Sequence, residues 1–372
     1  MTRSQAFCAL LSILQFLACG AETTGDTPIE GAQALQSVWI ELGRHLFYER
    51  RLSLNEDRSC GICHEQAKGF TDGFVRAVGT TEEIHPRNTL SLINVSHRSS
   101  LGWISQEHTS LESQLLIPLL GDMPVEMGLS AILYDRLEEL NADPTYQAFL
   151  SKLKLSKLTL DHIQNSIAQF ERTLTSDHSP YDDYISGNKD ALSPSAQRGL
   201  SLFTEVLSCG SCHGGRDFDQ PESAVQDLDA PLSSTALELH HERHGWFNTG
   251  LYHLDGGRYP PQREGLYERT SRTEDIGKYR VPTLRNLAFT APYYHDGSGA
   301  SIDDVLDNYN LGGRVTRSGP YIGDGRDHPN KHPLIRPLEL SSEDLNDLKA
   351  FLLSLTDQSI IHEPHFSDPW QR

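Results

Sequence analysis

Two stretches of the chain carry the pattern Cys-x-x-Cys-His, whose thiols and imidazole can hold a haem. They are Cys60-Gly-Ile-Cys63-His64 and Cys209-Gly-Ser-Cys212-His213. The two thiols of each motif add across the haem vinyl groups, and the histidine that follows is placed to reach the iron from the proximal side. One such motif could be a zinc site or a redox dithiol. Two, each with the terminal histidine, predict two covalent c-type haems.

Helical patterns surround both motifs. Apolar residues at helical spacing predict helices that begin at Val38 and lead into the first motif, and others that follow it, over 110–118, 130–153 and 160–175. The same pattern predicts a helix over 196–207 before the second motif and a closing helix over 342–355. The segments between are long and rich in Gly, Pro and Asp. We therefore predict a mainly α protein of two cytochrome c-like domains, each wrapping long irregular loops around one haem.

The N-terminus has the features of a secretory signal. One arginine, a short apolar run over 6–18 and Cys19 predict a signal peptide over 1–19 of the lipoprotein type, with Cys19 lipidated and the protein anchored in the periplasm. Secretion with simple cleavage nearby is the alternative. The expected units after it are a tether, an N-terminal domain, a C-terminal domain and a tail, at 20–37, 38–185, 186–360 and 361–372.

Charge and cysteine usage narrow the function classes. The formal net charge is −19, which argues against nucleic acid as a partner. Outside the signal the only cysteines are the four of the two motifs, so none is left for a disulfide or a thiol nucleophile. The cluster His240-His241-x-x-His244 could bind a metal, but a solvated loop is the favoured interpretation.

Several further stretches resemble the bacterial di-haem cytochrome c peroxidase and MauG superfamily, most closely its MauG and MbnH-type enzymes. They are Leu42-Gly-Arg-His-Leu-Phe47, Arg51-Leu-Ser53, Phe170-Glu-Arg-Thr-Leu174, Val281-Pro-Thr-Leu-Arg-Asn286 and Thr290-Ala-Pro-Tyr-Tyr-His-Asp-Gly-Ser298. The resemblance covers nearly all of residues 38–356. It implies two unequal haems, one that reacts with hydrogen peroxide in the N-terminal domain and one that stores charge in the C-terminal domain.

The resemblance also locates the distal ligand of the second haem. Peroxidases of the superfamily use a methionine fourteen residues after the histidine that matches His295, and here that position is Tyr309. The only methionines are Met1, Met123 and Met127. A tyrosinate favours higher oxidation states of iron than a thioether does. Competing candidates for this ligand are His328, His332, Tyr293 and Tyr294.

At the first haem, the resemblance implies an acid–base apparatus on the distal side. It is formed by Gln114, Pro118 and Glu126, although the spacing from Pro118 to Glu126 is two residues longer than in the peroxidases. The runners-up for the carboxylate are Glu112, Glu107 and Asp122. His85 could be a distal ligand, but we interpret it as a loop residue that leaves this haem open.

Two positions match residues between the domains. Trp103 matches the tryptophan that lies between the haems and passes charge from one to the other. Asn88, with the backbone carbonyls of Thr290 and Pro292, matches a calcium site. Glu171-Arg172 is predicted to form a structural ion pair. Trp246 and Trp370 are candidate surface exits for charge, although a packing role fits each of them better.

These assignments predict a MauG/MbnH-like di-haem oxidase. Hydrogen peroxide would generate a high-valent di-haem state that oxidises a residue, such as tryptophan, of a partner protein by long-range electron transfer. The first alternative is a di-haem cytochrome c peroxidase, which reduces hydrogen peroxide with electrons from a small cytochrome. The second is an electron-transfer cytochrome without catalysis. The membrane would be contacted only through the N-terminal lipid.

Overall fold

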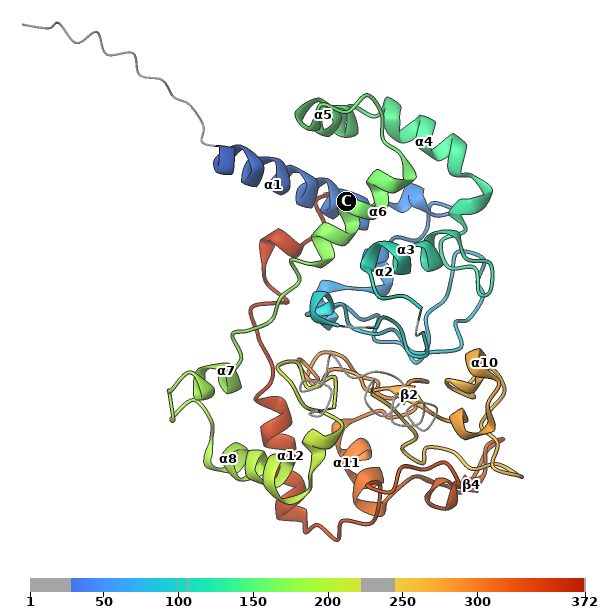
Figure 1. Ribbon diagram of the computed structural model, residues 1–372, viewed down its shortest axis with the longest axis vertical. Coiled ribbons are helices and arrows are strands. Elements are labelled where there is room, and N and C mark those ends of the chain that lie inside the picture. The colour runs from blue at the N-terminus through green and yellow to red at the C-terminus, as the bar shows by residue number, and fades with distance from the viewer. Residues whose placement is uncertain (1–27, 99, 106, 222–244, 371–372) are drawn as a thin grey trace, which may run out of the picture.

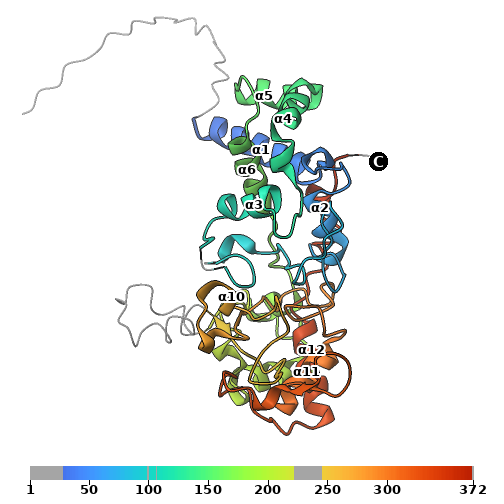
Figure 2. The same cartoon turned by 90° about the vertical axis from the view of Figure 1, so that its right-hand side faces the viewer.

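The computed structural model describes residues 28–98, 100–105, 107–221 and 245–370. Within them the chain is helix-rich and contains little sheet, which confirms the predicted mainly α fold. Figures 1 and 2 show two halves stacked along the long axis, with α1 (Pro28–Phe47) to α6 (Leu160–Glu171) in one half and α8 (Pro194–Ser201) to α12 (Ser342–Leu353) in the other. Among the described residues, no helix is long and apolar enough to cross a bilayer.

The first half is organised by the crossing of α1 and α6. Its helices are α1 (Pro28–Phe47), α2 (Cys60–Cys63), α3 (Leu111–Leu120), α4 (Leu133–Ala142), α5 (Pro144–Leu153) and α6 (Leu160–Glu171). Gly43 lets α1 approach the α6 backbone, because a Cβ there would collide with the Ser166 carbonyl oxygen. Leu46, Phe47, Ile163 and Phe170 are fully buried in the hydrophobic core that this crossing forms.

The second half repeats this crossing with α8 (Pro194–Ser201) and α12 (Ser342–Leu353). A Cβ on Gly199 would collide with the carbonyl oxygen of Asp347, just as a Cβ on Gly43 would collide with that of Ser166. The other elements are α7 (Pro180–Ile185), α10 (Tyr267–Thr270), α11 (Ile302–Leu311), β1 (Trp246–Phe247), β2 (Tyr279–Arg280), β3 (Val315–Thr316) and β4 (Gly323–Asp324). The strands form two antiparallel pairs, with Trp246 opposite Arg280 and Val315 opposite Asp324. The repeated helix pair supports the predicted plan of one motif per half.

Two expectations about the first half are wrong. Residues 28–37, predicted as tether, are the first part of α1. The helix expected over 130–153 is divided between α4 and α5. Asp143 is the N-cap of α5, its side chain accepting from the Thr145 amide, and Pro144 takes the first helical position. Proline has no amide hydrogen for the preceding turn, so a continuous helix is interrupted there.

The C-terminal segment returns to the first half instead of projecting as a tail. Ile360 is buried in the first core, and Phe366 and Trp370 pack against it. The Trp370 indole donates to the His45 carbonyl oxygen at 3.0 Å, and the Tyr48 hydroxyl donates to the Phe366 carbonyl oxygen at 2.6 Å. Figure 1 shows this segment running from α12 back beside α1 and α6. The second half is thus connected to the first at both of its ends, through the chain that follows α6 and through the C-terminal segment.

Candidate functional site

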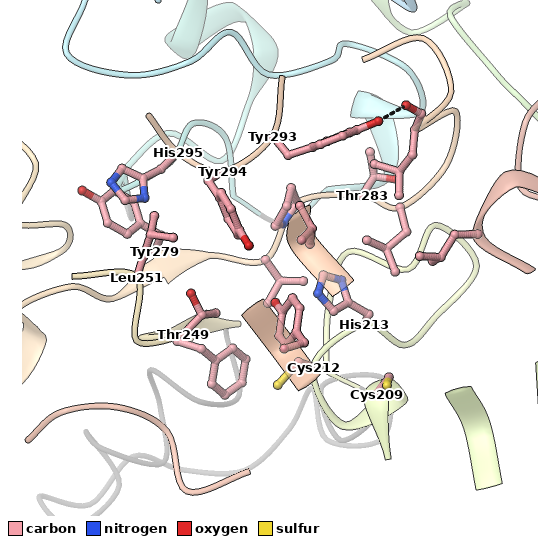
Figure 3. Close-up of a pocket in the computed structure, with 18 of the residues that line it drawn as sticks. Cys209, Cys212, His213, Thr249, Leu251, Tyr279, Thr283, Tyr293, Tyr294 and His295 are labelled. Carbon is pink, nitrogen blue, oxygen red and sulfur yellow. Dashed lines mark hydrogen bonds between the residues drawn. The ribbon is translucent and has the colours of Figure 1, made fainter. Parts of the chain in front are cut away.

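The second motif lies at one end of a large, mainly apolar cavity. Cys209, Cys212 and His213 line it, together with side chains from α11, α12 and the segment 279–295. His213 Nδ1 donates to the Phe218 carbonyl oxygen at 3.1 Å, which leaves Nε2 for a metal. Burial lowers the pKa of His213, so its imidazole is neutral, as a ligand must be. Figure 3 shows His213 and the two cysteines at one side, with Tyr294, Tyr279 and His295 further along the cavity.

Tyr309 lines the same cavity as His213, as the resemblance implies. Among the described residues, no side chain hydrogen-bonds to its hydroxyl. Burial raises the pKa of Tyr309, so its phenol stays protonated unless a cation draws the proton away. An iron ion would do so, since bound metals invert the local pKa order.

The competing candidates for this ligand are engaged elsewhere. Tyr293 donates its hydroxyl to the Leu287 carbonyl oxygen, and the Tyr294 hydroxyl accepts from Asn308. His328 bonds through Nε2 to the Gly257 carbonyl oxygen, and its Nδ1 accepts from the Asn330 amide. His328 and His332 do not line the cavity. Of the candidates that line the cavity, Tyr309 is therefore the one whose hydroxyl group is not engaged by another described side chain or carbonyl group.

The first motif has the same local design. Its thiols lie on the short helix α2, and His64 follows as the C-cap. His64 Nδ1 donates to the Phe70 carbonyl oxygen at 2.9 Å, and burial lowers the pKa of the imidazole. Neither motif forms a disulfide. Paired thiols and a neutral imidazole oriented through Nδ1 are groups that a covalent haem requires, and both motifs supply them; at the second motif the apolar cavity provides the space as well, so the residues present fit a haem.

Glu126 lies beside the first motif despite its unusual spacing. The Met127 amide donates to the Pro118 carbonyl oxygen at 3.0 Å, and the Thr80 amide donates to the Glu126 carbonyl oxygen at 2.8 Å. These bonds hold the Glu126 backbone against the end of α3. Its carboxylate is close enough to raise the pKa values of Cys60 and Cys63. Burial raises the pKa of Glu126 itself to about 7, although a third of the side chain is exposed.

The runners-up for this carboxylate fit less well. Glu112 forms an ion pair with Arg172 at 2.7 Å, whereas Glu107 and Asp122 are exposed. Gln114 stands one turn before Pro118 on α3, so both face the same side of the helix. Asp122 and Glu107 lie outside this helix face.

The His85 side chain lies next to the Glu126 carboxyl group. Its Nε2 lies 3.6 Å from Glu126 Oε1, while its Nδ1 accepts from the Arg87 amide. Burial lowers the pKa of His85 to about 4, so the ring is neutral at pH 7. The imidazole thus lies on the same side of the first motif as the candidate acid–base group. Its assignment as a loop residue stays a prediction.

The ion pair predicted between Glu171 and Arg172 is wrong. Arg172 pairs with Glu112, and Glu171 Oε2 is buried without a hydrogen-bond partner in the described structure. Adjacent helical residues point about 100° apart, so they do not face each other. Burial raises the pKa of Glu171 to about 8, and the carboxyl group lies close enough to Cys60 to add to the effect of burial on the pKa of that thiol. Sequence reasoning missed this second carboxyl group beside the first motif; a charged residue in a helix face otherwise made of Ile163, Ile167 and Phe170 was the available signal.

Trp103 connects the halves. Its indole donates to the Asn88 carbonyl oxygen at 2.8 Å, and its own carbonyl oxygen accepts from the Arg280 amide on β2. Trp103 also lines the second cavity, as do the three residues expected at a calcium site, Asn88, Thr290 and Pro292. The Asn88 amide nitrogen donates to the carbonyl oxygens of Phe74 and Val75, so its side-chain oxygen remains available. The structure therefore brings these interdomain residues together.

The remaining tryptophans do not suit a surface exit for charge. Trp246 is 2% exposed, and Trp370 packs on the first core. Both serve packing, as their sequence context favoured. The histidine cluster at 240–244 lies outside the described residues.

Comparison with known proteins places this geometry in a family. Residues 37–190 match the family model of di-haem cytochrome c peroxidase. The chain is 38% identical to a MauG-like protein associated with microbial copper homeostasis, whose crystal structure superposes with a TM-score of 0.82 over 90% of this chain and 93% of that one. It is 30% identical to cytochrome-c peroxidase IdrP1 of Denitromonas iodatirespirans, over 92% of this chain and 89% of the relative. It is 29% identical to methylamine utilization protein MauG of Methylorubrum extorquens, over 89% and 81%.

The chain belongs to the di-haem cytochrome c peroxidase and MauG family. Membership confirms the predicted family and fold and implies the two c-type haems that the motifs predict. It also confirms the prediction of an enzyme, a di-haem oxidoreductase that acts on peroxide. Relatives carry the names of both peroxidases and MauG, so the branch has to be argued from the site.

Proposed function

We propose that this protein is a MauG-like oxidase that uses hydrogen peroxide to oxidise a side chain, such as tryptophan, of a partner protein by long-range electron transfer. The observation that carries the proposal is Tyr309. It occupies the cavity of the second motif, where a peroxidase would present methionine, and no methionine follows Met127 in the chain. An anionic oxygen ligand suits a site that stores oxidising equivalents better than one that accepts electrons from a cytochrome.

The similarity to the MauG-like structure supports the same branch. At 38% identity it exceeds the identity to the two named enzymes compared above.

The residues of the first site would manage the protons of peroxide cleavage. When bound, the two haems supply the electrons that reduce peroxide and then hold the oxidising equivalents. Glu126 takes the proton from the near peroxide oxygen and delivers it to the departing one, a task suited to a carboxyl group with a pKa of about 7. Gln114 would orient the peroxide, and Pro118, on the same face of α3, would limit the space available to it. Trp103, at the junction of the halves, passes electrons between the two sites.

A second candidate function follows from the names of several relatives. The protein would then be a cytochrome c peroxidase, with a small cytochrome as its electron donor. Such an enzyme needs a reduced second haem before peroxide reacts, whereas a protein oxidase of the proposed kind reacts when fully oxidised. The two functions thus differ in the redox state that is competent.

Two further proposals concern the surroundings of this site. Asn88 and the carbonyl oxygens of Thr290 and Pro292 would bind calcium, a hard cation that prefers such oxygens, and fix the two halves relative to each other. The protein would lie in the periplasm, held to a membrane by a lipid on Cys19, which lies outside the described residues.

The test is to mix the fully oxidised holoprotein with one equivalent of hydrogen peroxide, and in parallel the protein reduced by one electron. The proposal predicts rapid peroxide consumption by the fully oxidised form, followed by oxidation of an added tryptophan-containing protein or peptide. Peroxide consumption that starts only after one-electron reduction would identify the protein as a cytochrome c peroxidase and contradict the proposal.

A further inference from the structure

A series of aromatic rings leads from Trp103 to the surface of the second half. Trp103 and Tyr279 have ring centroids 6.3 Å apart, and Tyr279 stacks on His295 at 3.6 Å with nearly parallel planes. His295 lies 6.5 Å from Tyr252, which lies 5.8 Å from Tyr321. Figure 3 shows the stacked Tyr279 and His295 at the far end of the cavity from Cys209. Every consecutive pair is in the range of direct aromatic contact.

The outer end of this series opens to solvent. Tyr252 and Tyr321 both line a shallow surface groove formed by 314–321, next to the β3–β4 pair. Tyr252 itself is 5% exposed, so its ring connects the interior to the groove without being accessible on its own. Tyr321 is half-buried and forms the outermost ring. The series therefore ends where a partner molecule can approach.

Tyr252 has a proton acceptor built beside it. Its hydroxyl donates to Asp296 Oδ2 at 2.5 Å, and the Asp296 carboxylate is 2% exposed. Burial pushes the pKa of Asp296 up, whereas hydrogen bonds from Ser298 and Tyr252 and the charge of Arg314 hold it below its ordinary value. Asp296 is therefore ionised and ready to accept a proton.

Positive charge makes this acceptor necessary. The Arg314 guanidinium lies 4.3 Å from the Tyr252 ring centroid, and that of Arg263 lies 5.7 Å from the Tyr321 ring centroid. A cation over the ring opposes a second positive charge on it, so Tyr252 can lose an electron easily only if it loses its proton as well. The hydrogen bond to Asp296 provides the path for that proton.

We infer that Trp103, Tyr279, Tyr252 and Tyr321 form an electron relay whose surface end, Tyr321, is where a phenol or indole side chain of the partner gives up its electrons. This inference rests on the proposed function, because peroxide supplies the oxidising equivalents. Each step moves one electron inward and leaves the electron deficit one ring further out, with His295 as the spacer between Tyr279 and Tyr252. Oxidised Tyr252 passes its proton to Asp296 Oδ2 and recovers it when Tyr321 reduces it. Tyr321, which lines the surface groove, releases its proton to water when it is oxidised and takes one back when the partner residue reduces it. The partner residue releases its own proton to water, and two such electrons balance one peroxide.

The relay is tested by trapping tyrosyl radicals in the oxidised holoprotein treated with one equivalent of hydrogen peroxide. The trap is 2-methyl-2-nitrosopropane, and adducts are located by peptide mass spectrometry and expressed per peroxide consumed. We expect at least ten times more adduct on Tyr321 than on Tyr134, an 84% exposed tyrosine of α4 that serves as the control. In Tyr252→Phe the adduct on Tyr321 should fall at least tenfold. Asp296→Asn should cause a similar fall while the Tyr252 ring stays in place.

Equal labelling of Tyr321 and Tyr134 would overturn the relay, as would a Tyr321 adduct that persists in both variants. A protein that consumes peroxide and carries its adducts elsewhere contradicts the relay alone. An oxidised protein that consumes no peroxide contradicts the proposed function and the relay with it.

Discussion

Glu126 is the residue on which peroxide cleavage depends in this account. Its pKa of about 7 leaves it protonated below pH 7 and ionised above, so the carboxylate that accepts the peroxide proton becomes available as the pH rises. We expect Glu126→Gln to slow the reaction with peroxide by about 10²-fold and to abolish a rise in rate centred near pH 7. Stopped-flow mixing at pH 5 to 9 measures both. Asp122→Asn, at an exposed runner-up position, should keep the rate and the pH profile; an unaltered profile in Glu126→Gln would exclude Glu126.

Glu171 makes the stability of the first half depend on pH. In the folded protein its pKa is raised to about 8, so folding favours the protonated form. That stability is complete below the unfolded pKa of about 4.3 and is lost as the pH rises to about 8, by about 1.4 kcal/mol per unit. The equivalent position in the second half is Leu352. Glu171 lies five residues after Ser166, whose carbonyl faces Gly43, and Leu352 lies five residues after Asp347, whose carbonyl faces Gly199. The variant Glu171→Leu therefore places the residue of the second half in the first. Unfolding of holoprotein at pH 5 and 8 should show a smaller pH dependence in this variant; an equal one would contradict the buried acid.

At the residue scale, sequence predicted the site better where a motif fixed the residue type. The paired thiols and the two proximal histidines lie where their motifs imply, and Tyr309, which the family resemblance assigns, lines the same cavity as the second motif. Glu126 could be proposed only by similarity, because the added residues before it alter the loop. The predicted ion pair of Glu171 with Arg172 is wrong because the surroundings of Glu171 depend on how α6 packs, which the next residue in the sequence does not indicate.

Gly43 and Gly199 allow the helices of each crossing pair, α1 with α6 and α8 with α12, to approach closely. An added methyl group at either would meet a backbone carbonyl of the crossing helix, which cannot move as a side chain can. We expect Gly43→Ala and Gly199→Ala each to destabilise the protein by about 1–3 kcal/mol through overpacking. Denaturant unfolding checks this, with Ser37→Ala on the exposed face of α1 as a control expected within about 0.5 kcal/mol. A neutral effect at both glycines would show that the helices do not cross so closely.

At the element scale, periodicity located the helices but not their ends. The helices predicted over 160–175 and 342–355 are present in the structure, but they end a few residues before the predicted ends, at Glu171 and Leu353. The break at Asp143-Pro144 was readable as an N-cap followed by a first-turn proline, but the apolar pattern on either side hid it. The sequence predicts residues 28–37 as tether because the segment that begins at residue 20 is rich in Gly, Thr, Asp and Pro and has few apolar positions; in the structure, residues 28–37 extend α1 from its packed end.

At the scale of the whole molecule, the C-terminal segment connects the second half to the first, and no local sequence pattern predicts this long-range packing. Residues 357–370 run from α12 to the first core, where Phe366 and Trp370 pack. We expect Trp370→Ala to destabilise the first half by about 2–4 kcal/mol, less than a fully buried tryptophan would. Hydrogen exchange should show faster exchange in α1 and unchanged exchange in α8. His365→Ala, an exposed neighbour, is the control, and equal effects on both halves would contradict a local role.

The account's central claim is that the two similar motifs form unequal sites, and that Tyr309 makes the second one a store of oxidising equivalents. The most direct measurement is the lifetime of the oxidised state after one equivalent of hydrogen peroxide is added to fully oxidised holoprotein, compared among wild type, Tyr309→Phe and Tyr294→Phe. Both tyrosines line the same cavity, but only the Tyr294 hydroxyl is bonded to Asn308. We predict at least a tenfold shorter lifetime in Tyr309→Phe and less than a twofold change in Tyr294→Phe. An unchanged lifetime in Tyr309→Phe would contradict the claim.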